Sequence, residues 1–295
     1  MVLVVFLLAY LVRRRLDSLG LLAGDEIWRR WFRRGSRVRA GHEAEVGKGL
    51  ALVLLPAFLL GLAEYLLVSS GWQLAAYPLE FLVLVSVMGA PGWRQALRAY
   101  AEAWQRGDMQ SAWHHIKDYL PARERGQAVS PEVMHLYLTR ALMVSVFQRF
   151  FLVAFWYVVG GIGLAVLARG LVALADHWPQ APARPRFARI SEWAGWIPAR
   201  LLSLTFGLAG DLAGWLQETR RTLTSVANTA GEVLMISANG SLTGYALDPA
   251  RFSRIHPEEW PGFGGRSLSA VRDLLNRSML VWICILALLV ISGVV

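Results

Sequence analysis

Residues 150–168 read FFLVAFWYVVGGIGLAVLA, a run of 19 residues without a charged side chain, lying between Arg149 and Arg169. A continuous helix of about 20 residues spans roughly 30 Å, the thickness of a bilayer's hydrocarbon core. We therefore expect this run to enter a membrane, with the two guanidinium groups reaching its opposite faces. Its middle is interrupted by three glycines, Gly160, Gly161 and Gly163. They allow a broken helix, whose loosened backbone is tolerated where other protein covers it.

The composition of the whole chain also indicates a membrane protein. Of 295 residues, 55% are hydrophobic and only 17% are charged, whereas soluble domains have about 25% charged residues. The mean hydropathy is +0.41. A disordered chain and a disulfide scaffold are excluded, because apolar content is high and there is one cysteine. Cys284 lies in an apolar run and is expected to behave as a small hydrophobic residue.

The chain is strongly basic, with 30 Lys and Arg against 21 Asp and Glu, a net charge of +9. The basic residues flank the apolar runs and do not form a stripe on one helix. This distribution is typical of membrane topology. We therefore predict the lipid bilayer, and no nucleic acid, as a partner.

Further membrane segments follow from the same pattern. Residues 50–93 carry only two charges, Glu64 and Glu80, and are divided at Ser69-Ser70-Gly71, which predicts a helical hairpin. Residues 279–295 form a C-terminal span. Residues 1–12 are too short for a full crossing at about 18 Å. Because their bases follow the apolar stretch, we interpret them as a retained partial helix and not as a cleaved signal.

The topology between these spans has two solutions. Residues 91–140 and 211–278 both look cytoplasmic, so an even number of crossings separates them. Either 150–168 crosses and 198–217 returns, or both are re-entrant. The loop between them is rich in arginine, and arginine-rich loops tend to stay in the cytoplasm. This tendency disfavours the first solution, but it has exceptions. We favour crossing and return.

The predicted fold class is all-α: a polytopic helical membrane protein with about four spans, a partial N-terminal helix and cytoplasmic helical segments. We divide the chain into a partial membrane helix and basic cytoplasmic segment (1–48), a transmembrane hairpin (49–90), a cytoplasmic helix pair (91–141), a broken membrane helix with loop and return helix (142–217), a cytoplasmic lobe (218–278) and a C-terminal transmembrane helix (279–295).

The cytoplasmic segments carry clear helix signals. Gly107 suits the end of one helix and Asp108 the N-cap of the next. Ser130 and Pro131 suit the start of a helix that runs into the membrane. Residues 239–265 look rich in loops, and Gly262-Phe263-Gly264-Gly265 is expected to be a turn.

Searches for catalytic motifs give weak signals. The stretch 41–48 ends in Gly-Lys, but its glycine spacing is one residue too long for a phosphate-binding loop and Gly49 replaces the Ser or Thr. The six histidines have no metal-ligand spacing, and no nucleophile elbow is present. We therefore predict no catalytic residue, no metal site and no cofactor.

The stretch Trp196-Ile-Pro-Ala-Arg-Leu201 is more informative. If Pro198 occupies the first turn of a helix, Arg200 lies beside exposed backbone N–H groups, an arrangement that favours an anion. The alternative is an interfacial anchor in which Arg200 binds lipid phosphate or a neighbouring helix C-terminus. Glu80 lies in an apolar stretch and either pairs with an arginine or remains near water if Pro78 starts its helix late. The candidate anion-binding residues are Trp196, Arg200, Arg169, Arg149 and Glu80.

At this motif the sequence resembles the membrane-protein family that includes the CbiB/CobD enzymes of cobalamin synthesis and the AmpE branch. Phe155-Trp156 through Gly160-Gly161, and the helix pair around Arg106-Gly107-Asp108, share the resemblance. The segment that carries an acidic signature in the synthase branch has Arg140, Val144, Ser145, Gln148 and Arg149 here, so an acidic surface has become apolar and basic, and only Gly24-Asp25 remains of an N-terminal motif. The likeness to the AmpE branch is closer, since it includes the Phe-Trp-x-x-Val-Gly-Gly core.

The resemblance implies a multi-pass protein of the bacterial inner (cytoplasmic) membrane, associated with regulation of β-lactamase induction and cell-wall recycling. Our first hypothesis is a non-catalytic signalling protein that binds an anionic small molecule or lipid phosphate and a membrane or cytoplasmic protein partner. The second is a CbiB/CobD-like synthase that makes adenosylcobinamide phosphate. A transporter is disfavoured because intramembrane polar groups are few. The sequence predicts no oligomeric state.

Overall fold

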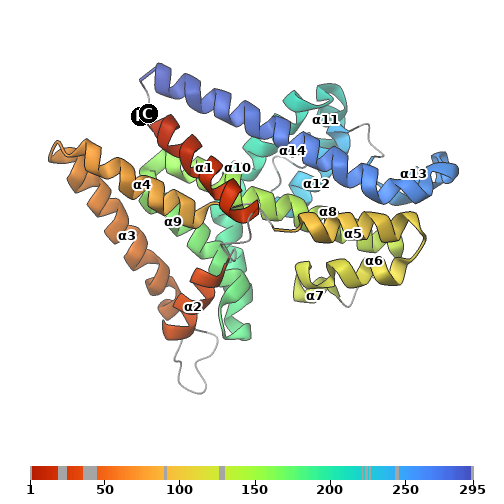
Figure 1. Ribbon diagram of the computed structural model, residues 1–295, viewed down its shortest axis with the longest axis horizontal. Helices are drawn as coiled ribbons and strands as arrows, with labels where there is room; N and C mark the ends of the chain where they lie inside the picture. Colours follow the sequence, from red (N-terminus) through yellow and green to blue (C-terminus); the bar gives the residue numbers. More distant parts are fainter. Residues whose placement is uncertain are drawn as a thin grey trace. The chain divides into compact units, whose positions relative to one another are not determined.

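The computed structural model describes residues 2–18, 25–35, 45–89, 92–125, 130–220, 222, 225, 227–242 and 246–293. Every regular element in these ranges is a helix (Figure 1), so the prediction of an all-α fold is confirmed. Gly24 and residues 41–44 of the candidate phosphate loop lie outside the described residues. The helices form two compact units, each assembled from segments distant in the sequence.

Unit 1 consists of Met1–Ala90, Phe147–Pro198 and Ile285–Val295. Its helices are α1 (Val2–Ser18), α2 (Glu26–Gly35), α3 (Gly47–Ser69), α4 (Gln73–Val87), the π-helical η2 (Phe147–Phe151), α9 (Leu152–His177), the 3-10 turn η3 (Ala181–Ala183) and the first half of α10 (Arg184–Ala209).

Unit 2 consists of Pro91–Val146 and Ala199–Cys284. Its helices are α5 (Arg94–Gln105), α6 (Met109–Ile116), η1 (Lys117–Tyr119), α7 (Ala122–Arg125), α8 (Pro131–Val146), α11 (Leu212–Thr219), α12 (Ala230–Ser241), α13 (Pro249–Ile255), η4 (Pro257–Glu259) and most of α14 (Trp260–Ile291). The six divisions made from the sequence stay predictions.

Three helices of the described chain are long and apolar enough to cross a membrane. They are α3, the helix 131–177 that joins α8, η2 and α9, and the helix 257–291 that contains α14. Helix α4 is apolar but shorter. The protein is therefore a helical membrane protein. The return crossing predicted over 198–217 is not among these helices, because α10 begins at Arg184, in the predicted polar loop, and ends at Ala209.

The predicted division of residues 50–93 into two helices at Ser69-Ser70-Gly71 is confirmed, although α4, with 15 residues, is shorter than the predicted span. Gly71 has a φ of 78°, a left-handed conformation that glycine adopts without strain. The backbone N–H of Trp72 donates to the carbonyl of Leu67 at 2.9 Å and so closes the end of α3. On α3, the small residues Ala57 and Gly61 face α9, where Gly163 approaches so closely that an added Cβ would lie 3.0 Å from Gly61 Cα.

The apolar start of the chain continues as α1 beyond the predicted partial helix, through Arg13 to Ser18. Arg13 is buried, and its Nη1 donates to the carbonyl of Val85 at 2.7 Å, while its Nε donates to Asp17 at 2.8 Å. A guanidinium at the end of α4 satisfies carbonyls that no helical N–H reaches. Arg13 thus fixes α1 against α4.

Unit 2 contains a buried polar connection that the sequence patterns did not indicate. His135 on α8 lies between Tyr100 Oη, 2.9 Å from Nδ1, and Ser267 Oγ, 2.5 Å from Nε2. Gly264 lies against the ring of Trp104, which explains a glycine there. The turn predicted at Gly262–Gly265 is wrong, because these residues belong to the first turns of α14.

Two local predictions in unit 2 are confirmed. Gly107 ends α5 with a φ of 75°, and the Asp108 side chain accepts a hydrogen bond from Ser111 N at 2.9 Å at the start of α6. The helix predicted to start at Pro131 is α8, and it continues into η2 and α9.

Candidate functional site

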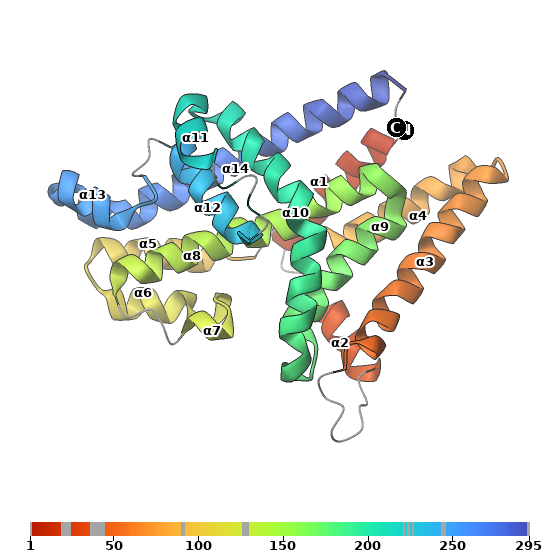
Figure 2. The same cartoon turned by 180° about the vertical axis from the view of Figure 1, so that it is seen from behind.

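The chain reverses at Gly160 and Gly161, inside α9. Gly160 has φ −159° and ψ 36°, and Gly161 has φ 69° and ψ −164°, neither of which is helical. The Gly161 conformation is open essentially to glycine alone, and a Cβ there would overlap the carboxylate of Glu64. Beyond the break, Ile162 N donates to Glu64 Oε2 at 3.0 Å, which caps the second half of α9. Figure 2 shows the change of direction within α9.

The reversal brings Arg149 and Arg169 to the same carboxylate. Arg149 Nη2 donates to Asp25 Oδ2 at 2.6 Å, and Arg169 Nη2 donates to Asp25 Oδ1. A straight helix would separate these residues by about 30 Å. The prediction that the two side chains reach opposite faces of the membrane is therefore wrong. Residues 150–168 form a helical hairpin, as the re-entrant solution requires.

This hairpin makes a prediction about sidedness. In a Cys284→Ser protein, cysteines introduced at Gln148 and Pro179, one beyond each arm, should react with an impermeant maleimide from the same side of the membrane. Both arms end near Asp25, so their outer ends share one side. The check is labelling in sealed vesicles of known orientation. Labelling of the two cysteines from opposite sides would show that residues 150–168 cross the membrane.

His177 completes what we call the Asp25 cluster, which consists of Asp25, Arg149, Arg169 and His177. The imidazole Nε2 of His177 lies 3.1 Å from Asp25 Oδ2. Burial on its own would raise the pKa of Asp25, but His177, Arg169 and Arg149 outweigh it and hold this pKa well below its ordinary value. Asp25 is thus a permanently charged carboxylate at physiological pH.

The members of the cluster come from three local structures, with Arg169 and His177 both on the second arm of α9. Asp25 precedes α2, and its carbonyl accepts from Arg29 N at 3.0 Å, which starts that helix. Arg149 lies in the π-helical η2, and such bulges occur often at functional sites. Arg169 is only 3% exposed and lies on the second arm of α9. The cluster therefore ties three separate segments of unit 1 together.

The prediction that Glu80 pairs with an arginine is wrong, and so is the alternative that Pro78 leaves it near water. Pro78 lies inside α4 and Glu80 is buried. Tyr157, on the first arm of α9, donates its hydroxyl to Glu80 Oε2 at 2.6 Å. Glu80 and Glu64 thus each bind one arm of the hairpin.

The helix start predicted at Pro198 is also wrong. Pro198 lies inside α10, so Arg200 is not beside exposed N–H groups of a helix terminus. Arg200 belongs to unit 2, where its Nη2 donates to the carbonyl of Ser225 at 2.7 Å. Trp196 is half-buried in α10. Of the five predicted site residues, the structure brings Arg149 and Arg169 together. Anion binding by the five remains a prediction.

Tryptophans replace the hydrogen bonds that two prolines remove. Pro198 has no N–H for the carbonyl of Ala194, four residues earlier, and that carbonyl accepts from Trp156 Nε1 at 3.0 Å. Pro56 likewise leaves the carbonyl of Leu52, which accepts from Trp31 Nε1 at 3.0 Å. Both helices continue through proline because a side chain satisfies the freed group.

This exchange predicts a coupled pair of substitutions. Trp156→Phe should lower the free energy of unfolding by about 1–3 kcal/mol, because it leaves a buried carbonyl unsatisfied. The same change should cost less in a Pro198→Ala protein, where the backbone N–H of the introduced alanine can donate to the carbonyl of Ala194. The check is a double-mutant cycle by thermal unfolding in detergent. Equal costs in both backgrounds would show that the indole does not serve this carbonyl.

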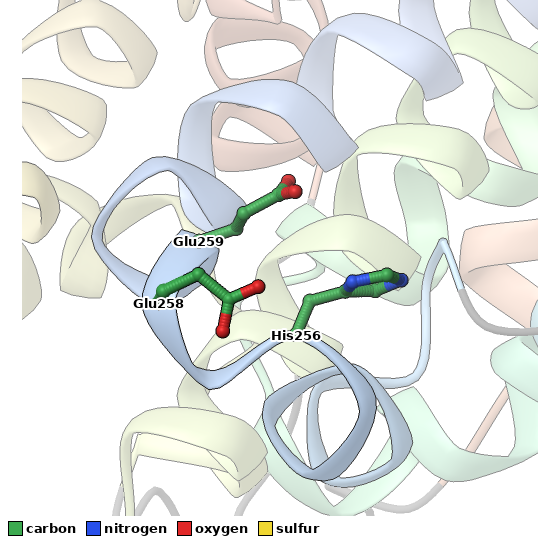
Figure 3. A group of neighbouring side chains, drawn as sticks. All are labelled: His256, Glu258 and Glu259. Atoms are coloured by element: carbon green, nitrogen blue, oxygen red, sulfur yellow. The ribbon is translucent and has the colours of Figure 1, made fainter.

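Unit 2 carries one group of potential metal ligands among its described residues, His256, Glu258 and Glu259, shown in Figure 3. Their ligand atoms lie within 4.8 Å of one another, but both glutamates are exposed. Glu259 also accepts a hydrogen bond from Arg266 Nη1. A guanidinium already bound to one carboxylate opposes a divalent cation there, so this group carries no argument for a metal.

The Asp25 cluster presents two guanidinium groups to one carboxylate. Such a pair can bind any carboxylate or phosphate oxygen in the same way. The sequence pattern indicates both arginines, but it does not indicate their partners Asp25 and His177. The residual Gly24-Asp25 motif was the available signal.

The sequence of this chain matches a known family. Residues 6–254 match the family described as Regulatory signalling modulator protein AmpE. The chain belongs to the AmpE family. The match covers α2, α3, α4, η2 and α9, and so includes every residue of the Asp25 cluster.

The AmpE-family chain is also similar to two proteins named Cobalamin biosynthesis protein CobD. One, from Chromobacterium violaceum, is 29% identical over 236 residues, which are 72% of this chain and 72% of that protein. The other, from Stutzerimonas stutzeri, is 27% identical over 238 residues, 78% of this chain and 75% of that protein. No solved structure matches.

Proposed function

We propose that this protein is a non-catalytic regulator in the bacterial inner membrane that acts in β-lactamase induction and cell-wall recycling. Membership of the AmpE family over residues 6–254 is the observation that carries this proposal. A multi-pass arrangement is part of this proposal, and the three helices that are long and apolar enough to cross a membrane support it. A membrane or cytoplasmic protein partner transmits the signal.

The Asp25 cluster supports an anionic ligand for this regulator. A phosphate or carboxylate of a small molecule, or a lipid phosphate, would accept from the Arg149 and Arg169 Nη2 atoms that now donate to Asp25. The ligand therefore exchanges with the chain's own carboxylate. Arg200, in unit 2, is a second candidate anchor for the same kind of ligand.

The test is complementation of a strain that lacks its AmpE-family gene, with β-lactamase induction as the readout. The wild-type chain should restore induction, and Arg149→Gln, expressed at the same membrane level, should not. The matched control is Arg98→Gln, an exposed arginine on α5. Full restoration by Arg149→Gln would remove the cluster from the function. For the second anchor, Arg200→Ala must change induction or the thermal shift with candidate anions.

A second candidate function is a membrane synthase of cobalamin synthesis. The two relatives named Cobalamin biosynthesis protein CobD, 29% and 27% identical, favour it. Its test is formation of adenosylcobinamide phosphate by the purified protein with magnesium and ATP, together with rescue of a synthase-deficient strain. Product formation would replace the non-catalytic proposal. Failure in both assays would reject the synthase.

A further inference from the structure

Helix α2 has one broad apolar face, and only part of it contacts the protein core. Trp28 and Phe32, four residues apart, pack into the core cluster of unit 1 with Val53 of α3 and Trp178. Ile27 and Trp31, also four residues apart, are 55% and 43% exposed. Residues four apart share a helix face, so Ile27 and Trp31 form a second apolar strip that the described part of the protein leaves uncovered.

The rest of the α2 surface is basic. Four arginines are exposed on its ten residues, Arg29, Arg30, Arg33 and Arg34. Glu26 is the one acid of the helix, and it pairs with Arg30 at 3.0 Å and Arg33 at 3.3 Å. Four arginines against one glutamate leave α2 with a net charge of +3.

A hydrogen bond fixes the position of α2 along the length of α3. Trp31 Nε1 donates to the carbonyl of Leu52, the group that Pro56 leaves without a helical partner. Leu55 and Phe58, 62% and 66% exposed, follow within about two turns on the outer face of α3. Helix α3 has 23 residues, about 35 Å in length, so its Leu52 end lies at the boundary between headgroups and hydrocarbon.

We propose that α2 is a lipid-binding helix, which places Ile27 and Trp31 at the top of the acyl chains and its arginines among the phosphates of anionic phospholipids. A basic helix with an aromatic and an aliphatic residue in its exposed apolar strip fits this position. The occupant is the anionic bilayer surface, because the helix carries four exposed arginines beside its exposed apolar strip. Trp31 of that strip also contacts α3 at Leu52, near the exposed apolar residues Leu55 and Phe58.

The first test measures the affinity of the full-length protein for a short-chain phosphatidylglycerol, from the rise in Tm during titration in neutral detergent. Each arginine near an anionic surface changes affinity by about fivefold. The variant Arg29→Gln, Arg33→Gln, Arg34→Gln should therefore bind at least about tenfold more weakly. High salt, about 0.5 M, should weaken wild-type binding as well.

The matched control removes three exposed arginines of unit 2, Arg94→Gln, Arg98→Gln and Arg106→Gln, and should retain most of the affinity. An equal loss in both triple variants would reduce the effect to net charge and overturn the proposal. A shift of the same size with inorganic phosphate would overturn it too, since a free-anion site and not a lipid surface would then be present.

A second measurement does not depend on stability. A nitroxide label at Ile27→Cys in a Cys284→Ser protein, reconstituted in bilayers containing phosphatidylglycerol, should show oxygen access and low access to a water-soluble nickel chelate. A label at the exposed Arg106 is the aqueous reference. Nickel access at position 27 equal to that at position 106 would show that α2 does not lie in the lipid interface.

Discussion

Asp25→Asn should be among the most damaging single substitutions in unit 1. We expect the free energy of unfolding to fall by about 3–5 kcal/mol, the usual cost of breaking a buried ion pair from one side. Asn keeps the shape of the side chain but removes the charge that Arg149 and Arg169 share, and Arg169 is only 3% exposed. The measurement is thermal or chemical unfolding of the full-length protein in detergent.

The adjacent acid provides the control. Glu26 also pairs with two arginines, but on the surface of α2, where ion pairs are screened by solvent. Glu26→Gln should therefore leave the Tm unchanged. If the two substitutions have similar effects, the Asp25 cluster does not hold the hairpin against α2.

The same carboxylate predicts a pH dependence. The pKa of Asp25 lies below its ordinary value in the folded protein, so its contribution to stability is complete above the unfolded pKa of about 3.9. As the pH falls below that value, the unfolded chain takes up a proton that the folded chain does not. The stability gap between wild type and Asp25→Asn should be constant at neutral pH and narrow below about pH 4.

The parts of the fold that the sequence predicts are those that local chemistry determines. Ser69-Ser70-Gly71 ends α3 because a left-handed glycine is required there, and Asp108 starts α6 because its side chain replaces a missing acceptor. Neither feature depends on distant residues. The same holds for the apolar length of α3.

The direction of the chain within the membrane was not predictable in this way. Hydropathy reports which residues prefer lipid, but a straight span and a helical hairpin of the same composition give the same profile. Asp25 is 124 residues from Arg149 and 144 from Arg169 in the sequence, so their meeting has no local signal. Only the Gly160-Gly161 pair indicated a break, and the sequence left its outcome open.

The sequence indicated only part of the candidate site, because the site also depends on contacts between residues that are distant in the sequence. Their positions at the ends of an apolar run selected Arg149 and Arg169 as candidate residues, but placed them on opposite faces of the membrane, and their shared partner Asp25 could not be deduced. Pro198 misled because proline in a first turn and proline in a membrane helix look alike in sequence. A proline inside a membrane helix is tolerated here because the indole of Trp156 donates to the carbonyl that Pro198 leaves free. Trp156 is 42 residues away from Pro198 in the sequence.

Gly161→Ala should disrupt the hairpin on which the whole site depends. At φ 69° and ψ −164°, a side chain costs about 1–3 kcal/mol from backbone strain alone. The new Cβ would also overlap the Glu64 carboxylate, which would then no longer accept from Ile162 N. We expect the free energy of unfolding to fall by at least about 3 kcal/mol when the backbone strain and the lost hydrogen bond at the helix start are combined.

Gly160→Ala, one residue earlier, is the matched control. Gly160 has a φ of −159°, outside the left-handed region that favours glycine, and the nearest atoms to a Cβ there belong to the flexible side chain of Leu164. Gly160→Ala should lower the free energy of unfolding much less than Gly161→Ala does when both proteins are unfolded in the same detergent. In the cysteine assay, Gly161→Ala should also make labelling at 148 and 179 heterogeneous, because Arg149 and Arg169 no longer meet at Asp25. Equal Tm values for the two alanine variants would mean that the reversal does not depend on the conformation of Gly161.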